Sequence, residues 1–218
     1  MAAAARPVAR SFVRAPPRAP LRRRRPARLC RAYTAEGQDD GDPLAALLET
    51  AAMPRWHADG TPEERVAQMG LVLDGRVPTN PVGVYHPVVL VGNTAHVSGQ
   101  IPRLPDGSLL KGVAGSTASE EDAAEAARNV GLTMLATLRA ELGSLDRVRR
   151  VIKVNGFVAS TPDFEAQPAV VNALSNLFID VFGPAGKSAR SAVGVAALPL
   201  GITVEAEAIV EVDLDDFV

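Results

Sequence analysis

The stretch SEEDAAEAARNVGLTMLATLRAELGSLDRVRRVIKVNGFVA, residues 119–159, decides the class of the fold, because it holds a helix followed by a strand. Ser119 precedes three acidic residues, an order that favours a helix start: serine caps free backbone N–H groups, and negative charge interacts well with the helix dipole. Apolar residues then recur at helical spacing from Ala127 to Leu142, and Gly143 suits the left-handed residue that ends a helix. Residues 149–159 are typical of a strand.

The segments on both sides of this stretch extend the pattern. VVLVGNTAHVSG, residues 88–99, predicts a hairpin of two strands joined at Gly92 and Asn93. Residues 168–182 form a second amphipathic helix pattern that ends at Gly183, and two strand-like runs follow it. The order β-β-α-β-α-β-β predicts an α+β fold with one sheet and both helices on one face. Further copies of the chain would have to cover the other face, which favours an oligomer.

The first of the last two predicted strands begins with a single arginine, Arg190. In TVEAEAIVEV, residues 203–212, side chains alternate between faces, so valines and alanines share one face while Glu205, Glu207 and Glu211 share the other. We expect the turn LPLG, residues 198–201, to fold the preceding strand back against this one. Arg190 would then come within reach of the glutamates.

Two interpretations of Arg190 follow from that placement. The first is a structural ion pair with Glu205 or Glu207, across neighbouring strands or subunits. The second is an anion site, because a guanidinium held on a strand binds a carboxylate through two parallel hydrogen bonds, the usual way to orient a small organic acid.

The N-terminal part of the chain differs in composition from the rest. Residues 1–31 hold ten arginines and no acidic residue, which leaves thirteen basic against 25 acidic side chains elsewhere. Residues 1–33 are therefore predicted to be an organelle-targeting presequence, for a plastid in slight preference to a mitochondrion, with a basic arm for RNA or lipid as the alternative. Residues 34–77 are interpreted as a linker with a short helix, capped by Thr61 and Glu64, ahead of a domain at 78–218.

Several function classes are disfavoured by the residues present. The single cysteine, Cys30, lies in the predicted presequence, and the three histidines have no ligand spacing, so neither thiol chemistry nor a metal site is expected. GPAGKS, residues 183–188, lacks the first glycine of a phosphate loop and runs from a helix into a strand. No run of about 18 apolar residues predicts a membrane span. The acidic remainder lacks the basic stripe typical of nucleic-acid binding.

Four segments together resemble the Rid family, the reactive-intermediate deaminases also called YjgF-like proteins. They are VGNTAHVSGQIP (91–102), LGSLDRVRRVIKVNGFVASTPDF (142–164), VVNALSNLFIDVFG (170–183), and ARSAVGVAALP (189–199) with VEAEAIVEV. The resemblance covers about residues 78–212 and implies a chorismate-mutase-like α+β fold. It also implies a homotrimer with sites between subunits and cofactor-free hydrolysis of enamines and imines derived from amino acids, which gives 2-keto acids and ammonia.

The resemblance also implies roles for individual residues. Arg190 would bind the substrate carboxylate, Gly99 would offer a backbone carbonyl, and Asn172 would contribute to substrate binding. Glu205 or Tyr85 would relay a proton. Each also has a structural interpretation: Tyr85 packs, Asn172 bridges helix and loop, and Glu205 fixes Arg190.

The chain also departs from the family pattern. Ala192 stands two residues after the arginine, where many members have cysteine, and about 40 extra residues precede residue 78. A non-catalytic trimer that binds small carboxylates is therefore kept as an alternative. An endoribonuclease, the label of some relatives, is a further one.

Overall fold

The computed structural model describes residues 60–77 and 83–214. Its helices and strands are α2 (Pro62–Gln68), β1 (Val88–Val91), β2 (Thr94–Gln100), α3 (Glu120–Leu142), β3 (Val148–Ala159), α4 (Gln167–Phe182), β4 (Ala189–Val195) and β5 (Val204–Val212), with 3-10 turns η1 (Leu145–Arg147), η2 (Gly183–Gly186) and η3 (Pro199–Gly201). After α2, the order of helices and strands is the predicted one. The predicted presequence lies outside the described residues and stays a prediction.

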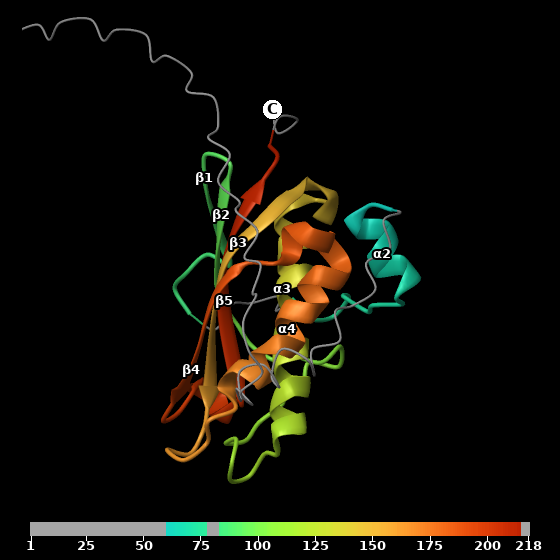
Figure 1. Ribbon diagram of the computed structural model, residues 1–218. Coiled ribbons are helices and arrows are strands. Elements are labelled where there is room, and N and C mark those ends of the chain that lie inside the picture. The colour runs from blue at the N-terminus through green and yellow to red at the C-terminus, as the bar shows by residue number, and fades with distance from the viewer. Residues whose placement is uncertain (1–59, 78–82, 215–218) are drawn as a thin grey trace, which may run out of the picture. The chain divides into compact units, whose positions relative to one another are not determined.

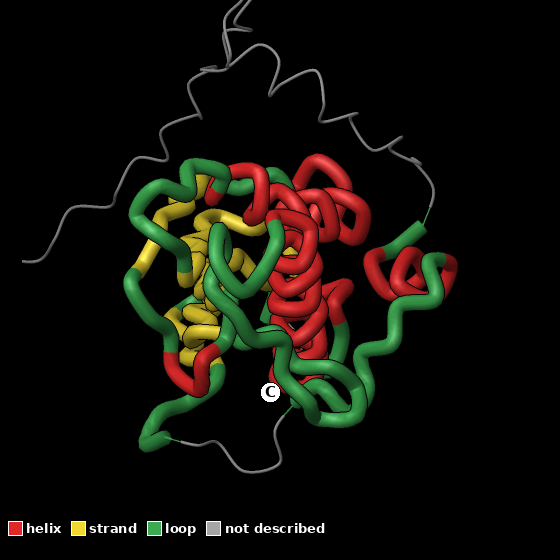
Figure 2. The backbone as a smooth tube through the Cα atoms, turned by 90° about the horizontal axis from the view of Figure 1, so that it is seen from below, coloured by secondary structure: helices red, strands yellow, loops and turns green. Residues whose placement is uncertain are grey.

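One five-stranded sheet forms the centre of the fold, in the order β1-β2-β5-β3-β4. The pairs β1/β2, β2/β5 and β3/β5 are antiparallel, and β3/β4 is parallel. Helices α3 and α4 pack side by side on one face of this sheet (Figure 1). Seen from below, the strands and the two long helices form two layers (Figure 2). The predicted α+β fold, with two helices on one face, is confirmed.

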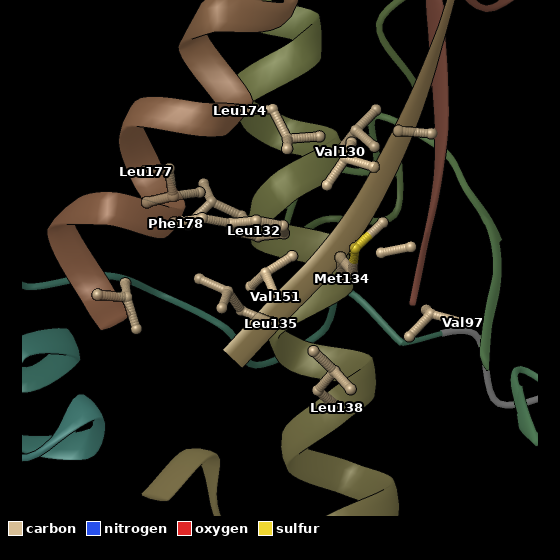
Figure 3. Packing of buried hydrophobic residues seen from close by; sticks show 14 of the residues in the cluster. Val97, Val130, Leu132, Met134, Leu135, Leu138, Val151, Leu174, Leu177 and Phe178 are labelled. Atoms are coloured by element: carbon tan, nitrogen blue, oxygen red, sulfur yellow. The ribbon is translucent and has the colours of Figure 1, made fainter. Parts of the chain in front are cut away.

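Helix α3 and strand β5 form for the reasons that the sequence indicates. Ser119 and Asp122 make a reciprocal capping box at the start of α3, and Gly143 ends the helix in the left-handed region at φ 80°. In β5, every second residue from Val204 to Val212 is buried, so the glutamates lie on the face away from the helices. Side chains from α3, α4 and β3 gather into one apolar core between the helices and the sheet (Figure 3).

Helix α2 lies on the outer side of the helix layer, away from the sheet (Figure 2). Thr61 and Glu64 form the predicted capping box. The Glu63 carboxylate accepts hydrogen bonds from the Arg139 guanidinium and from the backbone N–H of Leu145 at 2.9 Å, and Arg65 donates to the carbonyl of Val181 at 2.9 Å. These bonds join α2 to the C-terminal ends of both α3 and α4.

The expected pairing of the last two strands is wrong. Strand β4 pairs in parallel with β3, and β3 lies between β4 and β5. The physical reason is the α4 crossover: a helix returns the chain to the same end of the sheet, so β4 enters parallel to β3 on the open edge. The turn η3 then connects two strands that are not neighbours.

Helix α4 is apolar enough to raise the question of a membrane. By length and composition alone, Gln167–Gly186 could cross a bilayer, with a mean hydropathy of 1.2. Half of that window is buried inside the fold, and Val170, Val171 and Leu174 are fully buried in the core. The helix therefore has the packing of a core helix.

Candidate active site

Arg190 lies on the edge strand β4 and reaches towards α4. Its Nη1 donates to Asn172 Oδ1 and to Ser175 Oγ, both at 2.9 Å, and its Nη2 donates to the carbonyl of Pro168 at 3.2 Å. Asn172 and Ser175 are three residues apart, so they lie on one face of the helix. The half-buried guanidinium is therefore held in one orientation, and burial lowers the pKa of Arg190.

These hydrogen bonds use one side of the guanidinium only. Nη1 is occupied by two acceptors, and Nη2 uses one N–H for Pro168. Among the residues that the structure describes, none accepts a hydrogen bond from Nε of Arg190. The edge formed by Nε and the second N–H of Nη2 can thus bind two oxygens of one carboxylate in parallel.

A second group of predicted residues lines a pocket of about 410 Å³ at β2 and the start of β5. Tyr85, Gly99 and Glu205 are among its walls, with the remaining lining formed by Gly83, Ser98, Ile101, Pro199 and Leu200. Its volume lies within the range of small-molecule sites, roughly 300–1,000 Å³. The pocket combines one carboxyl group with mainly apolar walls.

Glu205 packs directly against the backbone at Gly99. A Cβ at position 99 would overlap Oε1 of Glu205, so only glycine allows the carboxyl group to lie there. Burial raises the pKa of Glu205, and the nearby carboxylate of Glu207 raises it further. Glu205 therefore keeps its proton to a higher pH than an exposed glutamate does.

The two groups of residues do not meet within one chain. Arg190 pairs in register with Val154, and Val154 pairs with Ala208 of β5, three residues from Glu205. Two strand spacings and three residues correspond to about 14 Å along the sheet. Arg190 also contacts α4, whereas Glu205 lies on the face of the sheet away from the helices.

The expectation that Arg190 comes within reach of the glutamates is therefore wrong inside one protomer. The reason is the position of β3 between β4 and β5, together with the opposite directions of the two side chains. Glu207 instead accepts a hydrogen bond from Asn155 Nδ2 at 2.8 Å. An ion pair between subunits stays a prediction.

Some site residues were not predicted from the sequence. Ser175 could have been found, because it lies three residues after Asn172 on a helix already predicted there. Leu200 and the carbonyl of Pro168 carry no sequence signal for a site. Within residues 60–77 and 83–214, no three His, Cys, Asp or Glu side chains are grouped as a candidate metal site.

The structure is an α+β fold with an oriented arginine on β4 and, on the other face of the sheet, a pocket that contains Glu205. Residues 76–212 match the family described as Endoribonuclease L-PSP, and the chain belongs to this family, which is the Rid or YjgF family. The resemblance stated from the sequence is confirmed.

Three known proteins illustrate the match. "Protein TCP17" of Trypanosoma cruzi is 40% identical over 159 residues, covering 66% of this chain and 99% of its own. A crystal structure of protein Atu1372, of unknown function, from Agrobacterium tumefaciens has a TM-score of 0.63 and 41% identity, covering 70% of this chain and 94% of that chain. A protein of Dermatophagoides farinae named 2-iminobutanoate/2-iminopropanoate deaminase is 35% identical over 134 residues, covering 61% of this chain and 89% of its own.

Proposed function

We propose that this protein hydrolyses 2-imino acids to 2-keto acids and ammonia without a cofactor. The observation that carries the proposal is the guanidinium of Arg190, which is fixed by α4 on one side and open to a carboxylate on the other. The deaminase name of the Dermatophagoides relative supports the same chemistry.

A second copy of the chain completes the site in this proposal. Arg190 and Asn172 would come from one subunit, and Tyr85, Gly99 and Glu205 from its neighbour. The separation of the two clusters within a protomer supports this, as does the open sheet face that the two helices leave uncovered. The family resemblance makes the expected assembly a homotrimer, in which each subunit would contribute both halves to different sites.

The chemistry needs only positioning and one proton donor. Arg190 binds the carboxylate, which holds the C=N carbon next to Glu205. Water adds to that carbon, and the C=N bond becomes a carbinolamine. The neutral Glu205 carboxyl protonates the amine nitrogen, the C–N bond breaks, and the hydroxyl proton returns to the glutamate as the ketone forms. One water is consumed, and one keto acid and one ammonia leave.

The other predicted residues assist these steps. The Gly99 carbonyl and the Tyr85 hydroxyl would orient water or the substrate nitrogen, since both lie in the pocket with Glu205. Asn172 acts through its hydrogen bond to Arg190 and is thus a positioning residue. No step requires a thiol, which agrees with Ala192 at the position where many members have cysteine.

The test is the hydrolysis of 2-iminopropanoate and 2-iminobutanoate generated in the assay by an amino-acid-oxidising enzyme. Arg190→Ala and Glu205→Gln should each be inactive as pure assemblies. Refolded together in equal amounts, they should recover about one quarter of wild-type activity, because a quarter of the interfaces in a closed ring then hold both intact residues. No recovery would contradict a shared site.

The same preparations distinguish the alternatives. A trimer that binds 2-keto acids but does not accelerate imine hydrolysis would be a carboxylate-binding protein. Cleavage of a synthetic RNA, abolished in Glu205→Gln, would instead support the activity in the family's description. A monomer by light scattering would contradict the assembly.

The location of the protein is a separate proposal, supported by composition alone. The arginine-rich residues 1–33 would direct the chain to an organelle, a plastid in slight preference to a mitochondrion, and be removed there. N-terminal sequencing of the protein from its source tests this, and a mature chain that begins at Met1 or Ala2 would contradict it.

A further inference from the structure

Leu200 has a backbone conformation that residues with a side chain rarely adopt. Its φ is 60° and its ψ is 7°, and it is the one non-glycine residue with positive φ in the described part of the chain. Left-handed conformations bring Cβ close to the backbone carbonyl, so they cost a leucine conformational energy. Such strain persists where the surrounding structure or the function requires it.

Core packing does not account for this conformation. The Leu200 side chain is 54% exposed, and none of the three residues of η3 is buried. Pro199 restricts the backbone before it, and Gly201, at φ 70°, follows it. The turn therefore holds a large apolar side chain at the surface in a fixed, unfavourable conformation.

The position of Leu200 is at the wall of the 410 Å³ pocket. Tyr85, Ile101, Pro199 and Leu200 make its apolar wall, and Glu205 lies in the same pocket against the backbone of Gly99. A ligand with its reacting group at Glu205 would extend its side chain along this wall. The wall offers a long apolar side chain much more contact than it offers a methyl group.

We propose that Leu200 is a specificity-determining residue that selects 2-imino acids with large aliphatic or aromatic side chains over those with one or two carbons. The inference rests on the proposed function for the reacting end of the ligand. The physical basis is burial of apolar surface, which increases affinity about fourfold for each CH₂ group removed from water.

The experiment measures binding of stable 2-oxo acids to the full chain by calorimetry, because these compounds carry the same carboxylate and side chain as the imines. Pyruvate and 4-methyl-2-oxopentanoate are compared. The wild type should prefer the longer compound by about 10-fold or more. Leu200→Ala should reduce this preference to about threefold or less, and Leu200→Met, which keeps a long apolar side chain, should retain most of it.

Val72→Ala is the matched control. Val72 is 56% exposed and lies outside the pocket, so this variant removes a similarly exposed apolar side chain and should keep the wild-type preference. An unchanged preference in Leu200→Ala, an equal loss in Val72→Ala, or no preference in the wild type would overturn the proposal.

The two proposals fail separately. If the wild type prefers the longer 2-oxo acid but hydrolyses no imine, the deaminase function fails and the role of Leu200 stands. If it hydrolyses imines of all side-chain lengths with equal kcat/KM and binds the 2-oxo acids equally, the role of Leu200 fails and the deaminase function stands.

Discussion

Arg76 and Arg190 are two arginines with the same kind of surroundings and different proposed roles. Burial lowers the pKa of both, and in the described ranges both donate to carbonyl, amide or hydroxyl oxygens and not to a carboxylate. Arg76 is 5% exposed and donates to the carbonyls of Val72 and Arg103 and to Asn129 Oδ1. Arg190 lies at the sheet edge and is half-buried.

The two arginines differ in which of their N–H groups have hydrogen-bond acceptors among the described residues. The Nε of Arg76 bonds to Val72, within its own segment, and Nη1 joins that segment to α3 and to the loop after β2. Arg190 uses Nη1 and one N–H of Nη2, and no described residue accepts a hydrogen bond from its Nε. A buried arginine without an acidic partner is therefore no sign of an anion site by itself. The proposal that Arg190 binds a ligand therefore depends on its Nε edge, which has no acceptor among the described residues.

The largest expected effect is on activity at Arg190. Arg190→Ala should lower kcat/KM for imine hydrolysis by about 100-fold or more, because the substrate carboxylate loses a charged hydrogen-bond partner. Arg190→Lys should keep most of that loss, since an ammonium cannot form the two parallel bonds. The midpoint of thermal unfolding should stay near that of the wild type. Wild-type turnover by well-folded Arg190→Ala would remove Arg190 from the site.

The second effect is on stability at Arg76. Arg76→Met should lower the free energy of unfolding by about 3 kcal/mol, because Asn129 and two carbonyls lose their charged donor in a buried setting. Denaturant unfolding at one fixed protein concentration measures this, with activity per folded protein unchanged. Arg150→Met, at an exposed position on β3, is the control and should change stability little. A loss of activity without loss of stability would reverse the assignment.

A smaller effect should appear in the pH dependence of stability. Because the pKa of Glu205 is raised in the folded state, the folded chain binds more protons there than the unfolded chain, so its contribution to stability falls as pH rises above the ordinary value of 4.5. Glu205→Gln should therefore gain stability relative to the wild type as pH increases from 4 to 8. Glu211→Gln, on the same face of β5, corrects for the loss of one negative charge. A pH-independent difference would contradict the placement of Glu205.

The smallest effect concerns the backbone at Leu200. Leu200→Gly should stabilise the fold by about 1 kcal/mol or less, since relief of left-handed strain exceeds the added chain entropy of glycine. Leu198→Gly is the control, because Leu198 has φ −123° and gains no such relief. Thermal unfolding of both variants measures the difference. A lower midpoint in Leu200→Gly than in Leu198→Gly would show that this strain is absent.

Local signals in the sequence predicted most of the fold. Ser119, Gly143 and the alternation in β5 act through neighbouring residues, so their patterns can be read along the chain. The pairing of β4 could not be read in this way. It depends on where the α4 crossover returns the chain, and the LPLG turn looks like a hairpin signal although its flanking strands are separated by β3.

The site was predictable only in its residue types. Arg190 and Glu205 came from the pattern of the last two predicted strands, and Asn172, Gly99 and Tyr85 from the family resemblance. The structure adds that these residues fall into two groups, with Arg190 and Glu205 about 14 Å apart in one protomer. That distance follows from strand order, which no short motif contains. The left-handed backbone at Leu200 could not be predicted from the sequence either, because leucine rarely adopts a positive φ.

The hydrogen bonds of α2 also set an order of events during synthesis. The hydrogen-bond partner of Glu63 is Arg139, 76 residues further along the chain. The partner of Arg65 is Val181, 116 residues away. Helix α2 is among the first described segments to leave the ribosome, yet it can complete these bonds only after α3 and α4 have both been made. Closing such long loops is slow compared with forming a local helix. Among the described helices, the first to be synthesised thus completes its contacts only after the last has been made.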